Sequence, residues 1–227
     1  MIKVENIEPW GFEHAIRGMR NPMNSWDKSD SDVAFHVVEN FAPGDPMQDK
    51  YYEWNDKYNL NIKIGKNDLS LMKRLYKAGS EHRKYLRQIF VSLDITAPLY
   101  WWKEFDTYKI GTVANSCSTM HKIAAKEFEL DDFSHEHMTE GNIQGFGLIL
   151  NCLNTARQNY LETKDKLWWW QMIQTLPSSY NQRRTITMNY ENVITMIRQR
   201  SGHKLDEWND FVDLLLKLPY VSEICGD

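Results

Sequence analysis

Apolar residues recur every three to four positions along much of the chain, which is the pattern of amphipathic helices. Asn67 suits an N-cap, Pro98 suits a first helical turn, and Gly79 and Gly111 suit helix ends. The last helical segment, which carries Trp208, is expected to be the terminal helix. The spacing predicts helices over residues 11–19, 67–79, 98–111, 146–160, 168–176, 193–197 and 208–215.

Shorter segments rich in β-branched residues predict strands at Ile2–Ile7, Ile89–Ile95 and Thr185–Met188. Helices and strands together, in 227 residues of which 42% are hydrophobic, predict one α+β domain over 1–227 with a sizeable core. We find no internal repeat and no low-complexity tract.

The least regular part of the chain is an expected loop or insertion at about 21–66. Its first part, 21–32, is polar and rich in turn-forming residues, and Pro43-Gly44-Asp45-Pro46 breaks regular structure. A connection of this length in a compact domain is either a functional lid or arm, or disordered. The sequence of residues 35–66 gives no physical account of their role.

Charge and cysteine content exclude several classes of protein. The net charge of −4 gives no global attraction to nucleic acid or to an anionic membrane. Cys117, Cys152 and Cys225 are far apart in sequence, so we expect no disulfide framework and no metal site. The chain shows no signal peptide and no apolar run of membrane-spanning length, and we expect a cytoplasmic protein.

The segment 97–117 carries the most specific pattern in the chain. It reads Ala-Pro-Leu-Tyr-Trp-Trp-Lys-Glu-Phe-Asp-Thr-Tyr-Lys-Ile-Gly-Thr-Val-Ala-Asn-Ser-Cys. This resembles the signature of the flavin-dependent thymidylate synthases, which runs roughly Ala-Pro-Ile-Phe-Val-Ala-Arg-Gln-Trp-x-Arg-His-Arg-x-x-Ser-x-Asn-Glu-x-Ser. Two further blocks resemble the same family: one contains His82, and the other runs from Leu176-Pro177 through Asn189 to Arg200 and His203.

The resemblance implies a fold and an activity. The fold would be one α+β domain around a twisted antiparallel or mixed sheet flanked by helices, assembled as a homotetramer. The activity would be reductive methylation of dUMP, with FAD as cofactor and methylenetetrahydrofolate and NADPH as co-substrates. The flavin would supply the difficult chemistry while the protein positions it.

The resemblance also implies a set of site residues. Arg200 is the candidate catalytic residue, polarising a pyrimidine carbonyl. Candidate cofactor-binding residues are His82, Lys109, Thr112, Asn115, Asn189 and His203, and candidate substrate-binding residues are Lys103, Glu104, Cys117 and Arg200.

Several signature positions are substituted. Thr107-Tyr108-Lys109 stands in place of Arg-His-Arg, and Glu191 replaces the arginine of Asn-x-Arg. A lysine offers a point charge where arginine offers a bidentate fork, and each lost charge-assisted hydrogen bond is worth roughly 1.5–3 kcal/mol. The candidates for compensation are the nearby cations Arg83, Lys84, Arg87, Arg183 and Arg184.

These substitutions leave two alternatives to the enzyme. One is a nucleotide-binding or oligomeric protein that keeps the scaffold without the chemistry. The other is a flavoenzyme acting on another pyrimidine nucleotide, because the carboxylate of Glu104 would favour a base edge rich in donors. For the Trp101-Trp102 pair and the Trp168–Trp170 run, packing in a core or subunit interface is expected over base stacking, and for Cys117 a buried inert thiol is expected.

Overall fold

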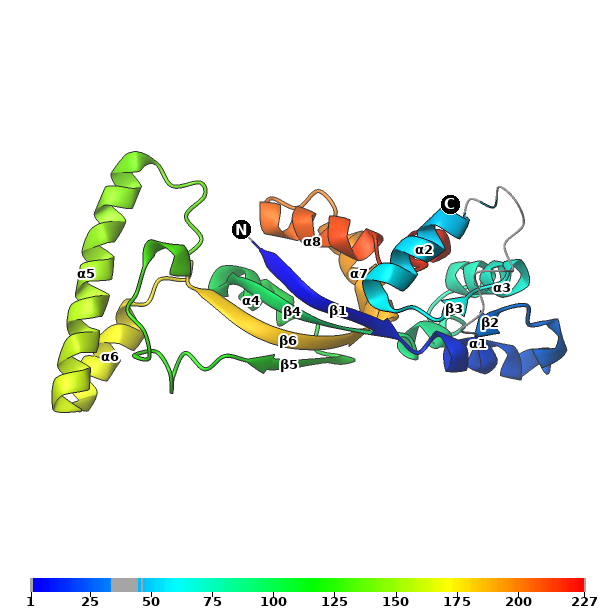
Figure 1. Ribbon diagram of the computed structural model, residues 1–227, viewed down its shortest axis with the longest axis horizontal. Coiled ribbons are helices and arrows are strands. Elements are labelled where there is room, and N and C mark those ends of the chain that lie inside the picture. Colours follow the sequence, from blue (N-terminus) through cyan, green and yellow to red (C-terminus); the bar gives the residue numbers. More distant parts are fainter. Residues whose placement is uncertain (1, 34–44, 46, 227) are drawn as a thin grey trace. The chain divides into compact units, whose positions relative to one another are not determined.

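The computed structural model describes residues 2–33, 45 and 47–226 (Figure 1). The strands are β1 Lys3–Trp10, β2 Asp32–Val33, β3 Ile62–Lys63, β4 Phe90–Pro98, β5 Thr112–Ser116 and β6 Asn181–Asn189. The helices are α1 Phe12–Arg20, α2 Met47–Tyr58, α3 Lys66–Lys77, α4 Leu99–Phe105, α5 Glu140–Thr163, α6 Lys166–Thr175, α7 Tyr190–Arg200, α8 Asp206–Leu216 and α9 Val221–Cys225. The expected α+β class is confirmed.

Four of the strands form one sheet in the order β1-β4-β6-β5. Backbone hydrogen bonds fix the register of β4 against β6: Tyr190 N–H donates to Ile89 O at 2.9 Å, and Leu99 N–H donates to Tyr180 O at 3.0 Å. Residue numbers rise on one strand as they fall on the other, so the pair is antiparallel. The second sheet is the short antiparallel pair β2 and β3.

The chain divides into two compact units. Unit 1 comprises residues 1–5, 94–108 and 114–186, and unit 2 comprises 6–93, 109–113 and 187–227. The expectation of one domain over 1–227 stays a prediction.

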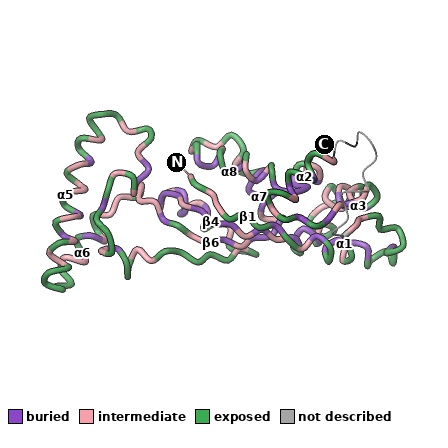
Figure 2. The backbone as a smooth tube through the Cα atoms, in the orientation of Figure 1, coloured by how far each residue is buried: buried purple, intermediate pink, exposed green. Residues whose placement is uncertain are grey.

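The core of unit 2 is built around aromatic side chains on helices. Phe12 of α1 contacts the rings of Tyr190 and Tyr220 edge-on, with centroids 5.5 and 5.8 Å away. Trp208 and Phe211 of α8 are fully buried. Along α7 and α8, buried positions alternate with exposed and intermediate ones (Figure 2), which is the expected result of their apolar stripes.

Unit 2 also contains a buried ion pair. Asp68 of α3 accepts hydrogen bonds from Arg20 Nε at 2.6 Å and from the hydroxyls of Ser29 and Ser31 at 2.7 Å each. The backbone N–H groups of Asp30 and Ser31 donate to the same carboxylate at 3.1 Å. Because Asp68 is completely buried, these donors replace the water that its charge would otherwise require.

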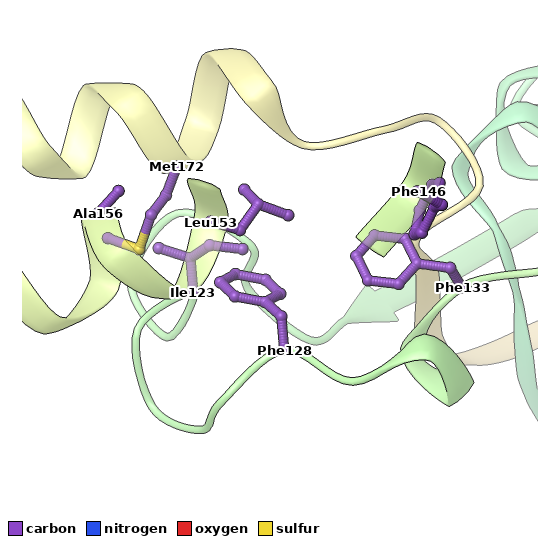
Figure 3. Close-up of a cluster of buried hydrophobic side chains, with 7 residues drawn as sticks. All are labelled: Ile123, Phe128, Phe133, Phe146, Leu153, Ala156 and Met172. Carbon is purple, nitrogen blue, oxygen red and sulfur yellow. The ribbon is translucent and has the colours of Figure 1, made fainter. Parts of the chain in front are cut away.

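Unit 1 has its own apolar cluster, formed where α5 packs on α6 (Figure 3). Phe133 contacts Phe146 edge-on at a centroid distance of 5.0 Å. Elsewhere in unit 1, Trp101 and Trp102 of α4 are fully buried, which confirms packing as their role. The members of the cluster are Ile123, Phe128, Phe133, Phe146, Leu153, Ala156 and Met172.

Some element boundaries differ from expectation. The helix after Pro98 ends at Phe105 rather than near Gly111, and Gly111 itself lies in a turn with φ +73° that leads into β5. The N-cap of α3 is Gly65, not Asn67. Asp30 supplies the missing cap, since its carboxylate accepts the N–H groups of Asn67 and Asp68.

The expectation of an irregular segment over 21–66 is wrong in part. It contains α2, whose Tyr51 and Trp54 are buried, and the β2–β3 pair. The expectation of a lid, an arm or a disordered loop concerns in part residues 34–44 and 46, which lie outside the described residues. The expectation that the helix carrying Trp208 is the terminal one is wrong, because α8 is followed by α9 over Val221–Cys225. Among the described residues, no helix combines the length and the apolar character needed to cross a bilayer.

Candidate functional site

The first half of the signature segment ends strand β4 and forms helix α4, in unit 1. Pro98 is extended, with φ −68° and ψ 152°, and serves as the N-cap of α4. Trp102 Nε1 donates to Gln182 O at 2.9 Å, which fixes the buried face of the helix against β6. Lys103 is therefore exposed on α4 and Glu104 is half-buried.

Residues 109–113 of the signature, which belong to unit 2, form a tight turn held by two asparagines. Asn192 Nδ2 donates to Ile110 O at 2.6 Å and to Thr112 Oγ1 at 2.8 Å, so both of its amide hydrogens are used. Asn189 is the N-cap of α7, and its Oδ1 accepts the N–H of Asn192 at 3.0 Å. The structure thus brings the expected residues Thr112 and Asn189 to one place.

Gly111 has a direct structural role in this turn. Its positive φ is costly for any residue with a Cβ, and a Cβ placed there would lie 2.3 Å from Asn189 Nδ2. Lys109 lies on the same turn with an exposed side chain. The turn therefore carries a cation and a hydroxyl, and the buried carboxamide of Asn189 lies against it.

Arg200 and His203 also lie together, at the end of α7. The Arg200 guanidinium stacks on Trp208 at 4.6 Å from the ring centroid, and its Nη1 is 3.2 Å from His203 Nε2. The N–H of Leu205 lies 3.1 Å from the other ring nitrogen of His203, Nδ1. The guanidinium of Arg200 is therefore held between the Trp208 ring and the His203 imidazole.

The substitution at Glu191 is balanced by an arginine from a distant part of unit 2. Arg83 Nη2 lies 2.8 Å from Glu191 Oε1, and Arg83 Nε donates to the same oxygen at 2.9 Å. The Arg83 guanidinium also lies 5.6 Å from the Tyr76 ring. Arg83 is thus committed to a carboxylate and does not compensate for a lost phosphate ligand.

The arginine pair on β6, in unit 1, is committed in the same way. Arg183 Nη2 lies 2.7 Å from Asp94, and its Nη1 is 3.8 Å from Glu5. Hydrogen bonding to Asp94 raises the pKa of Arg183 further. Arg184 Nη1 lies 2.7 Å from Asp106, and its guanidinium stacks on Trp102 at 4.2 Å.

The remaining expected residues are on surfaces. Asn115 and Cys117 are exposed on or just after β5, so the expectation of a buried thiol at Cys117 is wrong. The cause is that β5 is an edge strand, tied to the sheet by the Cys117 N–H to Arg183 O hydrogen bond at 2.9 Å. His82 is exposed in the loop after α3. Lys84 and Arg87 are exposed at the two ends of a short 3-10 helix, Lys84–Arg87.

Sequence reasoning missed the residues that hold these groups in place. Asn192 follows Asn189 by three positions, which is the spacing of an N-cap and its hydrogen-bonded N–H, and this signal was available. The spacing around Trp208 predicts only a helix and gives no sign of its contact with Arg200. No group of three or more metal-ligating side chains gathers anywhere in the part of the chain that the structure describes.

Comparisons with known proteins give the fold. No family model and no curated protein sequence matches this chain. Solved structures do match this chain. One is the flavin-dependent thymidylate synthase ThyX from Helicobacter pylori complexed with FAD and dUMP, with a TM-score of 0.62 and 16% identity over 98% of this chain and 99% of that one.

A second structure of ThyX from Helicobacter pylori, also with FAD and dUMP, has a TM-score of 0.61 and 16% identity over 100% of this chain and 98% of that one. Because both chains are covered almost completely, the likeness extends to the whole fold rather than to one motif. The fold of this chain is therefore that of the flavin-dependent thymidylate synthase ThyX.

Proposed function

We propose that this chain binds FAD and a pyrimidine nucleotide, and that it carries out reductive methylation of dUMP with methylenetetrahydrofolate and NADPH. The supporting observation is the match of the whole fold to ThyX structures that hold FAD and dUMP. The collinear motif blocks around Ala97-Pro98, Asn189 and Arg200 agree with it.

The chemistry of the turn in unit 2 fits a flavin or a nucleotide. Lys109 offers a cation, Thr112 a hydroxyl and Asn189 Nδ2 an amide donor that is not used by the N-cap bond. The carbonyls of a flavin ring and the oxygens of a phosphate are acceptors, so donors are the groups required. In this proposal His82 and Asn115 contribute further cofactor contacts, and Lys103, Glu104 and Cys117 contact the nucleotide.

The bound flavin would supply the redox chemistry. The protein's part rests on Arg200, whose stacking on Trp208 restricts the guanidinium to few orientations. A guanidinium N–H donated to a pyrimidine carbonyl would draw electron density toward that oxygen and favour an electron-rich C5. His203, whose Nε2 lies 3.2 Å from Arg200 Nη1, is in this proposal a further cofactor-binding residue.

We also propose that the protein is a cytoplasmic homotetramer, in keeping with the resemblance. Ile110 and Val113 near β5, and Leu148 on α5, are 91%, 65% and 69% exposed. Burial of these side chains between subunits would remove their apolar surface from water. Sedimentation of the purified protein tests this, and a monomer at micromolar concentration would contradict it.

The test of the reaction is release of tritium from dUMP labelled at C5, with FAD, methylenetetrahydrofolate and NADPH present. Arg200→Ala is expected to lower kcat/KM at least a hundredfold. The matched control is Arg198→Ala, which removes an exposed arginine on the same helix. Equal loss in both variants, or none in Arg200→Ala, would show that Arg200 is not the catalytic residue.

A second candidate function follows from the charge balance. Arg83, Arg183 and Arg184 are all held by carboxylates, so the lost Arg-His-Arg cations are not replaced by them. This favours a protein that binds a nucleotide without methylating it. Consumption of NADPH that depends on both dUMP and folate would eliminate this candidate.

The third candidate, a flavoenzyme for another pyrimidine nucleotide, rests on the half-buried carboxylate of Glu104. Such a carboxylate would accept from the amino group of cytosine. A binding competition between dCMP and dUMP tests this candidate, because it requires that dCMP bind more tightly than dUMP.

A further inference from the structure

Unit 1 contains a cavity that none of the proposed site residues lines. It lies where α5 ends and α6 begins and has a volume of about 550 Å³, within the usual range of small-molecule sites. Its lining combines basic, aromatic and apolar side chains. The lining residues are Met120, His121, Ile123, Ala124, Tyr160, Lys164, Lys166 and Trp169.

The walls of this cavity are fixed before any ligand arrives. Trp169 Nε1 donates to Met120 O at 2.9 Å, which ties α6 to the 120–124 segment. Arg157 Nε donates to Ala124 O at 3.1 Å, which ties the same segment to α5. Ile123 belongs to the buried cluster of Figure 3, so the floor of the cavity is part of the core.

The lining of the cavity includes two lysines and no carboxylate. Lys164 is the αL C-cap of α5, and Lys166 opens α6. Neither ammonium group forms an ion pair with a carboxylate in the described part of the chain; they lie 5.8 and 5.9 Å from the rings of Tyr160 and Trp170. The intervening Asp165 is engaged as N-cap, accepting the N–H of Leu167 at 2.9 Å.

From this combination we propose that the cavity binds an aromatic compound carrying a phosphate or carboxylate group. The anionic group would lie between Lys164 and Lys166, with His121 as a further polar contact. The ring would lie against Trp169 and the apolar wall formed by Ile123 and Ala124, where planar groups gain from stacking and burial. This site is independent of the proposed FAD and dUMP site.

The test uses 1-naphthyl phosphate as probe, titrated calorimetrically into the full chain with FAD and dUMP present in excess. We expect one binding site for 1-naphthyl phosphate per chain. The double variant Lys164→Gln/Lys166→Gln should weaken it at least tenfold. The control Lys122→Gln, an exposed lysine outside the lining, should change it less than twofold.

Two reference compounds test separately whether the cavity requires the anionic group and the aromatic ring. 1-Naphthol, which lacks the charge, and inorganic phosphate, which lacks the ring, should each bind at least tenfold more weakly than 1-naphthyl phosphate. The proposal is overturned if wild-type protein does not bind the probe at millimolar concentration, or if either reference compound binds equally well. It is also overturned if Arg200→Ala abolishes binding while the double lysine variant does not, because the probe would then occupy the nucleotide site.

Discussion

The guanidinium of Arg83 lies 2.8 Å from the carboxylate of Glu191, and the second oxygen of that carboxylate, Oε2, is buried without a hydrogen bond. Arg83→Met would leave a largely buried negative charge without its partner. We expect it to lower the free energy of unfolding by about 1–3 kcal/mol, measured by denaturant titration. The double variant Arg83→Met/Glu191→Leu should recover most of this loss, since it removes both charges.

The control for this pair is Lys84→Met, which removes an exposed neighbouring cation. If Arg83→Met costs no more than Lys84→Met, the ion pair does not stabilise unit 2.

The buried carboxylate of Asp68 predicts a dependence of stability on pH. Burial acts to raise its pKa, but hydrogen bonds from Ser31, Ser29 and Arg20 hold the pKa below its ordinary value. A lowered folded-state pKa means that the stabilisation is present above the unfolded value of about 3.9 and is lost as pH falls through the folded value. Asp68→Asn should cost about 3 kcal/mol at neutral pH, with the difference from wild type narrowing below about pH 3.9.

The matched control for Asp68→Asn is Asp27→Asn, an exposed aspartate in the same unit. A difference between wild type and Asp68→Asn that stays constant from pH 6 to pH 3 would contradict the account of this carboxylate.

Three buried tyrosines predict a second pH dependence, at the alkaline end. Burial raises the pKa values of Tyr85, Tyr190 and Tyr220, and their hydroxyls bond to the backbone at Met72, Pro219 and Ile64. Above about pH 10 the unfolded chain ionises while the folded chain does not, so stability falls as pH rises, by up to about 1.4 kcal/mol per unit for each group.

Tyr85→Phe should reduce this alkaline slope, because one buried hydroxyl is removed. The exposed Tyr52 serves as the control position, and Tyr52→Phe should leave the slope unchanged. Identical slopes for wild type and Tyr85→Phe would show that this hydroxyl does not resist ionisation in the folded protein.

Gly111 permits a test of the turn in unit 2. Gly111→Ala forces a Cβ into a left-handed residue and against Asn189 Nδ2, so it should cost about 1–2 kcal/mol and weaken FAD binding. Gly145→Ala, on α5, meets open space and should stabilise by about 0.5–1 kcal/mol. If both substitutions stabilise the protein, the turn is not constrained as described.

Local pattern predicted most of the regular elements but missed α2, the strands β2, β3 and β5, and the last helix α9. Tyr51 and Trp54 are the only buried residues of α2 in the described structure, so its apolar stripe is too short to stand out. The sequence Pro43-Gly44-Asp45-Pro46 predicts a break in regular structure, although Asp followed by Pro is also a signal for the start of a helix. The Met47 N–H does donate to Asp45 Oδ1 at 3.0 Å.

The ion pairs around the expected site residues could not be predicted from local pattern. Arg83 and Glu191 are 108 positions apart, and Arg184 and Asp106 are 78 apart. Such pairs are set by strand order and register, which periodicity does not encode. The exposure of Cys117 was missed for the same reason, because only the sheet order shows that β5 is an edge.

The central claim is that this fold holds a flavin, and the most direct measurement is the visible absorption spectrum of freshly purified native protein, repeated after addition of FAD and dUMP. We expect a yellow protein with a structured flavin band that retains FAD through gel filtration. A colourless protein that stays colourless after incubation with excess FAD and removal of the unbound cofactor would contradict the claim.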